Sequence, residues 1–216
     1  SLDSTASRAE HSLTHDKPRF AFFQVFQPRG GGKRQAPTFD VIAPGVAKHE
    51  EEIVLAPGAE PAADPNLVLR VAVAAAEFGL PIAPGTLRNL KKCPIGDRNW
   101  TDESRELFIR LLASGPALLN VWEDIDFIDV PGKLIPEWLG VRNRPSASAA
   151  HRYTIDRHMV EVVTRLGRET PSGGRYDDRH YEALLLAGIL HDIGKRPGVA
   201  NHAAEGARHA TVVVER

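Results

Sequence analysis

The sequence predicts a mainly α-helical protein in which a small β segment precedes the helices. Two observations support this prediction. From about residue 57 onward, apolar side chains recur at the spacing of one helix face. The short runs with a strand-like bias all lie before that point.

The β segment is expected between residues 19 and 56. Residues 19–26 (RFAFFQVF) are rich in aromatic side chains, and residues 39–43 and 52–56 are short apolar runs separated by a polar turn. A β-hairpin formed by the last two runs is the simplest prediction. The stretch Gly30-Gly31-Gly32 lacks the spacing of a P-loop or dinucleotide fingerprint, so it is interpreted as an ordinary loop.

Three helices are expected between residues 64 and 132, and each is bounded by capping residues, proline or glycine. The boundary residues are Asp64-Pro65 and Gly79 for the first helix, Thr101-Asp102 and Gly115 for the second, and Pro131-Gly132 at the end of the third. Trp122 and Trp138 are interpreted as core aromatics rather than as ligand-stacking residues.

Three further helices are expected from residue 151 to the end. Thr154 caps the first, Asp177-Asp178 starts the second, and Asn201 caps the third. Residues 183–190 (ALLLAGIL) are apolar, which predicts that the second of these helices is buried on most sides.

Composition excludes several classes of protein. Hydrophobic residues make up 42% and charged residues 25%, as in ordinary soluble globular proteins. The net charge of −1 gives no argument for a nucleic-acid or membrane partner, and no apolar run reaches the ~18–20 residues of a membrane span. A single cysteine, Cys93, excludes an internal disulfide framework and suits the cytoplasm. Without an initiator Met, and ending within a helical pattern, the chain reads as a fragment.

His191-Asp192 is the strongest candidate for a functional site. The pair follows the apolar run 183–190, where two polar residues are costly unless they have partners. A second His-Asp pair, His15-Asp16, lies in a polar leader with no helix ahead of it and is interpreted as a solvated loop. Metal binding is therefore predicted for His191 and Asp192 together.

Residues on the neighbouring helices extend this candidate site. His158 lies on the preceding helix, Lys195 stands one turn after Asp192, and His202 lies near the start of the next helix. Imidazole and carboxylate ligands suit a divalent metal, which would lower the pKa of a coordinated water and polarise a phosphoryl oxygen. Lys195 would neutralise the phosphate, so the parts predict a phosphoester hydrolase.

Simpler interpretations of these residues stay open. His158 could be a surface histidine, His202 a neighbour of a cap, and Lys195 a solvated charge that stabilises a helix C-terminus. His180 and His209 are assigned to solvent. His151 could contact a substrate or merely cap a turn.

Several segments resemble the bacterial PII uridylyltransferase/uridylyl-removing enzymes. Residues 151–158 (HRYTIDRH) resemble that family's HxYTVDxH segment, and residues 191–195 (HDIGK) resemble its HDIxKG motif. Residues 201–207 (NHAAEGA) are similar to its DHSxxGA segment, and residues 134–138 (LIPEW) to its LxPEW/F stretch. Residues 43–46 (APGV) resemble the end of its nucleotidyltransferase half, as found in actinobacterial members.

The resemblance implies two opposed activities. A nucleotidyltransferase domain attaches UMP, or AMP in some actinobacteria, from UTP or ATP to a tyrosine of the nitrogen-signalling protein PII. An HD domain removes the nucleotide, and ACT domains sense glutamine. The implied cofactor is a divalent metal, Mg²⁺ or Mn²⁺.

The resemblance also assigns residues and domains. His158, His191 and Asp192 become metal ligands, and Asp192 and Lys195 catalytic residues. His202 becomes a second-metal or phosphate ligand, and His151 and Arg157 substrate-binding residues. The implied fold is a truncated helical HD-domain bundle (148–216), preceded by a helical linker (61–147) and a small β/α remnant of a nucleotidyltransferase domain (1–60).

Some expected features are absent from the sequence. Asn201 stands where the family has Asp, and the paired-Asp transferase motif and a distal Asp ligand are both missing. The chain alone is therefore expected to be inactive. Two alternatives remain: another metal-dependent HD phosphohydrolase acting on a nucleotide or phosphodiester, and a helical regulatory module with a degenerate site.

Overall fold

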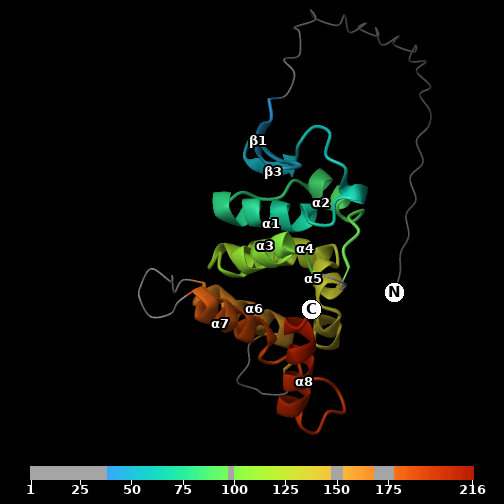
Figure 1. The fold of residues 1–216 in the computed structure, drawn as a ribbon, viewed down its shortest axis with the longest axis vertical. Coiled ribbons are helices and arrows are strands. Elements are labelled where there is room, and N and C mark those ends of the chain that lie inside the picture. Colours follow the sequence, from blue (N-terminus) through green and yellow to red (C-terminus); the bar gives the residue numbers. More distant parts are fainter. Residues whose placement is uncertain (1–37, 97–99, 147–152, 168–177) are drawn as a thin grey trace, which may run out of the picture. The chain divides into compact units, whose positions relative to one another are not determined.

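The computed structural model describes residues 38–96, 100–146, 153–167 and 178–216, all within the unit formed by Pro37–Arg216. The predicted strand 19–26, the Gly-rich loop, His15-Asp16 and His151 lie outside the described residues. Among those described, eight α-helices follow a small sheet (Figure 1), so the predicted mainly helical fold is confirmed. None of these helices is long and apolar enough to cross a membrane.

The sheet is a three-stranded antiparallel meander of β1 (Asp40–Ala43), β2 (Val46–His49) and β3 (Glu52–Leu55). The predicted hairpin was wrong about pairing, because β2 lies between the two expected strands and pairs with both. The turn between β1 and β2 is very short, and Gly45 adopts a φ of 75° there. The strand β2 was not predicted because it ends in the polar residues Lys48 and His49, which were assigned to the turn.

The helices and 3₁₀ segments follow the sheet in a single run. They are η1 (Pro61–Ala63), α1 (Leu67–Phe78), α2 (Pro84–Leu90), α3 (Asp102–Leu112), α4 (Ala117–Phe127), α5 (Val130–Leu134), η2 (Pro136–Gly140), α6 (Ile155–Leu166), α7 (Asp178–Leu190) and α8 (His202–Val214).

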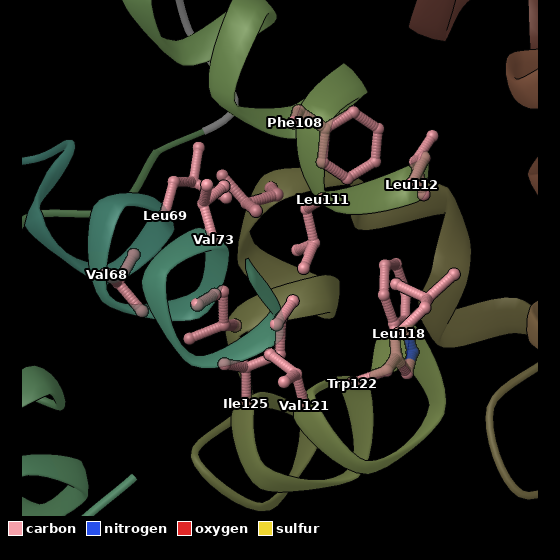
Figure 2. Packing of buried hydrophobic residues seen from close by; sticks show 14 of the residues in the cluster. Val68, Leu69, Val73, Phe108, Leu111, Leu112, Leu118, Val121, Trp122 and Ile125 are labelled. Atoms are coloured by element: carbon pink, nitrogen blue, oxygen red, sulfur yellow. The ribbon is translucent and has the colours of Figure 1, made fainter. Parts of the chain in front are cut away.

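Helix α1 occupies the centre of the N-terminal part of this unit. It packs against β2 and β3 on one side and against α3 and α4 on the other (Figure 1). Nine of its twelve residues are buried, and its polar residues Arg70 and Glu77 pair with charged residues of α3. Figure 2 shows Val68, Leu69 and Val73 of α1 beside Leu111 of α3 and Ile125 of α4. Burial of these side chains is the main stabilising contribution in this part of the fold.

This core is connected to the candidate site by a series of packed helices, α4, α6, α7 and α8. Helix α6 packs on α4, α7 packs on α6, and α8 packs on α7. Trp122 and Trp138 are 5% and 1% exposed, with ring centroids 5.3 Å apart. The prediction that both tryptophans are core residues is confirmed.

Most predicted helix ends agree with the structure. Gly79 ends α1 with a φ of 64°, the Thr101 hydroxyl accepts a hydrogen bond from Ser104 N, and the Asn201 side chain accepts one from Ala204 N. Thr154 occupies the N-cap position of α6 but its side chain makes no capping hydrogen bond.

Other expectations need correction. Helix α1 begins at Leu67, because the Asp64 carboxylate accepts from Asn66 N and pairs with Arg70 at 2.6 Å instead of capping a helix at Pro65. The predicted third helix is broken at Asp129, whose φ of 62° separates α4 from α5. Helix α7 was predicted to be buried on most sides; Leu185 and residues 188–190 are buried, and Ala183 and Ala187 are exposed.

Candidate metal centre

Three predicted metal ligands lie together in the structure. His158 is on α6, and His191 and Asp192 follow the last residue of α7. One ligand atom from each lies within 4.8 Å of the other two. Two segments that are distant in sequence therefore place two imidazoles and one carboxylate at one point.

A glycine brings the two helices close enough for this arrangement. A Cβ atom at Gly188 would lie 2.7 Å from Leu166 Cδ1 and 3.1 Å from Val163 Cγ2, both on α6. An alanine there would require the Leu166 and Val163 side chains to move. Glycine at position 188 therefore permits close packing of α7 on α6, the helix that carries His158.

The same glycine also orients His191. The Nδ1 atom of His191 lies 2.8 Å from the carbonyl oxygen of Gly188. Because a carbonyl only accepts hydrogen bonds, Nδ1 is the donor in this contact, and in the neutral ring Nε2 would then carry the lone pair. A backbone partner on one ring nitrogen is the usual arrangement in a metal-binding histidine. The Nε2 atom lies 3.4 Å from Asp192 Oδ2.

Asp192 provides the negative charge of the group. Its side chain is 12% exposed, and its Oδ2 accepts a hydrogen bond from Lys195 Nζ at 2.7 Å. His158 Nε2 lies 4.0 Å from the same oxygen, and the rings of His158 and His191 are nearly perpendicular, at 76°. Lys195 thus neutralises the carboxylate and stands next to the two imidazoles.

The donor set fits a divalent metal. Imidazole nitrogen and carboxylate oxygen suit Mn²⁺ and the later transition metals, and the oxygen also suits Mg²⁺. Cys93 is not a member of this group, and burial raises the pKa of its thiol to about 11.

The turn that follows Asp192 docks α8 onto the site. A Cβ atom at Gly194 would overlap the carbonyl oxygen of His202 and lie 2.7 Å from Gly206 Cα. His202 is exposed and lies outside the three-residue group, but it lines a cavity together with Lys195.

The predicted substrate-binding residue Arg157 has other contacts. It forms ion pairs with Glu123 and with Glu161, at 3.1 Å for the latter, and lies over the ring of Tyr153. It lines a different cavity from Lys195, so its substrate role stays a prediction.

His209 was assigned to solvent, and this assignment was wrong. It is 8% exposed, and its Nε2 lies 2.8 Å from Glu205 Oε1. Hydrogen bonds from Arg208, helped by His209, lower the pKa of Glu205 to about 2. The helical i,i+4 spacing of Glu205 and His209 was the signal for this pair. His180 is exposed, as predicted.

Comparison with known proteins finds relatives that share one name. The bifunctional uridylyltransferase/uridylyl-removing enzyme of Streptomyces coelicolor is 39% identical over 191 residues, which is 87% of this chain and 22% of that protein. The Mycobacterium tuberculosis enzyme of the same name is 38% identical over 173 residues, 80% of the chain and 21% of the relative. The chain is homologous to one segment of these enzymes.

Other relatives of the same name extend the comparison. The bifunctional uridylyltransferase/uridylyl-removing enzyme of Corynebacterium glutamicum is 34% identical over 132 residues, which is 61% of this chain and 18% of that protein. The chain thus spans about a fifth of the length of these curated relatives. No protein-family model matches the chain. No solved structure matches it either.

Two arginines near the site were not singled out from the sequence. Arg144 and Arg196 line the same cavity as Lys195 and His202. Arg144 falls in the basic connector between η2 and α6, and Arg196 directly follows the motif that resembles HDIxKG in the bifunctional enzymes. Neither position has a spacing that indicates ligand binding by itself.

Proposed function

We propose that this chain carries metal ligands of the nucleotide-removing activity of a bifunctional PII-modifying enzyme. The observation that carries the proposal is the convergence of His158, His191 and Asp192 in a chain homologous to uridylyltransferase/uridylyl-removing enzymes. The substrate would be PII protein that bears UMP or AMP on a tyrosine, and the full-length enzyme would work in the cytoplasm under control by glutamine.

The bond to be cut is a phosphodiester between a nucleotide and a tyrosyl oxygen. A phenolate leaves more readily than an alkoxide because its conjugate acid has a pKa of about 10. A bound Mn²⁺ or Mg²⁺ would supply Lewis-acid polarisation of the phosphoryl group and lower the pKa of water at the site.

The chain's own residues have separate roles in this proposal. Gly188 holds the His191 ring so that Nε2 faces the ligand group. Lys195 donates a hydrogen bond to Asp192 at 2.7 Å. From this position it would donate to a phosphoryl oxygen and offset the negative charge of the phosphate. His202 would contact the phosphate from the start of α8.

The test is Mn²⁺ binding by the chain, measured by calorimetry. We expect His191→Ala to weaken binding at least tenfold, since it removes one of three ligands. His180→Ala is the matched control, because it removes an exposed histidine at the other end of α7. Equal affinities in the wild type and His191→Ala would reject the metal site.

A further inference from the structure

A basic cavity lies beside the proposed metal centre. Its volume is about 450 Å³, within the range of small-molecule pockets. Its polar lining includes Arg144, Lys195, Arg196 and His202, and none of its described lining residues is a carboxylate. Its net charge is therefore positive, which favours an anionic ligand.

Both arginines are held in place by backbone carbonyls. Arg144 Nε donates to Gly140 O at 2.6 Å, and Arg196 donates from Nε to Ile193 O at 3.2 Å and from Nη2 to Glu137 O. Within the described part of the chain, neither arginine pairs with a carboxylate. Each guanidinium thus keeps its charge, and each retains N–H donors beyond those the carbonyls use.

The lining of the cavity also has an apolar part. It includes Ile155 at the start of α6 and Val199 in the loop before α8, together with two prolines. Ile155 N donates to Arg144 O at 2.8 Å, so the apolar part and one arginine are fixed to each other. A lining that combines apolar and basic side chains suits a ligand that carries both a flat ring system and a phosphate.

We propose that this cavity binds the nucleoside monophosphate portion of the substrate. The phosphate would lie against Arg144, Arg196 and Lys195, and the base against Ile155 and Val199. Lys195 joins the cavity to the metal ligands, because it also donates to Asp192. The inference rests on the proposed function, which makes a nucleotide the product released there.

Another cavity in the same unit differs in charge. It has a volume of about 240 Å³, and its charged lining consists of one guanidinium, Arg157, and three carboxylates, those of Glu123, Asp126 and Asp156. Burial, despite hydrogen bonds from Arg142, raises the pKa of Asp126. Negative groups would repel a phosphate, so the basic cavity is the better fit for a nucleotide.

The experiment is a titration of the metal-free chain with UMP, AMP, uridine or inorganic phosphate. Binding is monitored by the chemical-shift changes of the backbone amides in NMR spectra. We expect UMP or AMP to bind at least tenfold more tightly than uridine or phosphate alone, with the largest shifts at Ile155 and Val199. Arg144→Gln should weaken nucleotide binding about tenfold or more, because it removes charge-assisted hydrogen bonds. The control Arg88→Gln removes an exposed charge on α2 and should leave affinity unchanged.

The inference is overturned if the nucleotide shifts residues elsewhere, or if Arg144→Gln binds as tightly as Arg88→Gln. The unfolding midpoints of both variants show whether they are folded. The amide shifts of the wild-type chain locate the nucleotide without any variant. His191→Ala separates the two proposals, because it should lose Mn²⁺ affinity and keep nucleotide affinity. A chain that binds Mn²⁺ but no nucleotide would reject this inference and leave the metal site standing.

Discussion

Gly194 determines how closely α8 approaches the turn that follows α7. A Cβ atom there would meet backbone atoms of His202 and Gly206, which cannot move aside as a side chain can. We expect Gly194→Ala to lower the free energy of unfolding by about 1–3 kcal/mol, the usual cost of overpacking. Urea unfolding measures this change.

Gly85→Ala serves as the control for this substitution. The nearest atom to a Cβ atom at Gly85 is Arg88 Nη2, at 3.8 Å, and Gly85 lies within α2. Alanine there should not lower the free energy of unfolding, because it also reduces the conformational entropy of the unfolded chain. Equal destabilisation by both alanines would show that the contact between Gly194 and α8 is unimportant.

The sequence predicted that His158, His191 and Asp192 lie together, but not the environment of these side chains. His191 and Asp192 were predictable because a polar pair after an apolar run needs partners. The hydrogen bond from His191 to Gly188 was not predictable, since it depends on how α7 ends. His209 was misassigned because a lone histidine carries no sign of burial, although its pairing with Glu205 follows helical spacing.

At the scale of elements, η2 connects the turn after Asp192 to the end of α8. The backbone oxygen of Glu137 accepts from Arg196, and its carboxylate pairs with Arg216 at 2.6 and 3.0 Å. Burial alone would raise the pKa of Glu137, but hydrogen bonds from Arg216 outweigh it and hold the pKa below 4.5. The ionised carboxylate therefore stabilises the fold.

This coupling predicts a pH dependence of stability. The pKa of Glu137 is lower in the folded state than in the unfolded state. The ionised carboxylate therefore contributes its full stabilisation above the unfolded-state pKa, and this stabilisation is lost as the pH falls through the folded-state pKa. We expect Glu137→Gln to cost about 1–3 kcal/mol near neutral pH. The difference from the wild type should shrink as pH falls from about 6 to about 3. A difference independent of pH would contradict the assigned ion pair.

Element prediction succeeded where periodicity extended over several turns. Helices α3, α6 and α8 have an apolar face and a recognisable first residue, so the sequence specifies them locally. The helix α2 was missed because its seven residues are too few to establish a period, and β2 was missed because it ends in polar residues. The break at Asp129 depends on a positive φ that the sequence does not signal.

At the scale of the whole molecule, a mainly helical chain brings residues from two helical segments to one group. The fold class was predictable from composition and periodicity, whereas the contact between α6 and α7 required the structure. The division into 1–60, 61–147 and 148–216 stays a prediction. The basic cavity depends on residues from separate segments, and no single motif contains it.

The central claim is that this region removes nucleotide rather than attaching it. The most direct measurement compares both activities of the full-length enzyme after Asp192→Ala. The account predicts that metal-dependent release of the nucleotide from modified PII is abolished, while transfer of the nucleotide to PII is largely retained. Loss of both activities, or release at the wild-type rate, would contradict it.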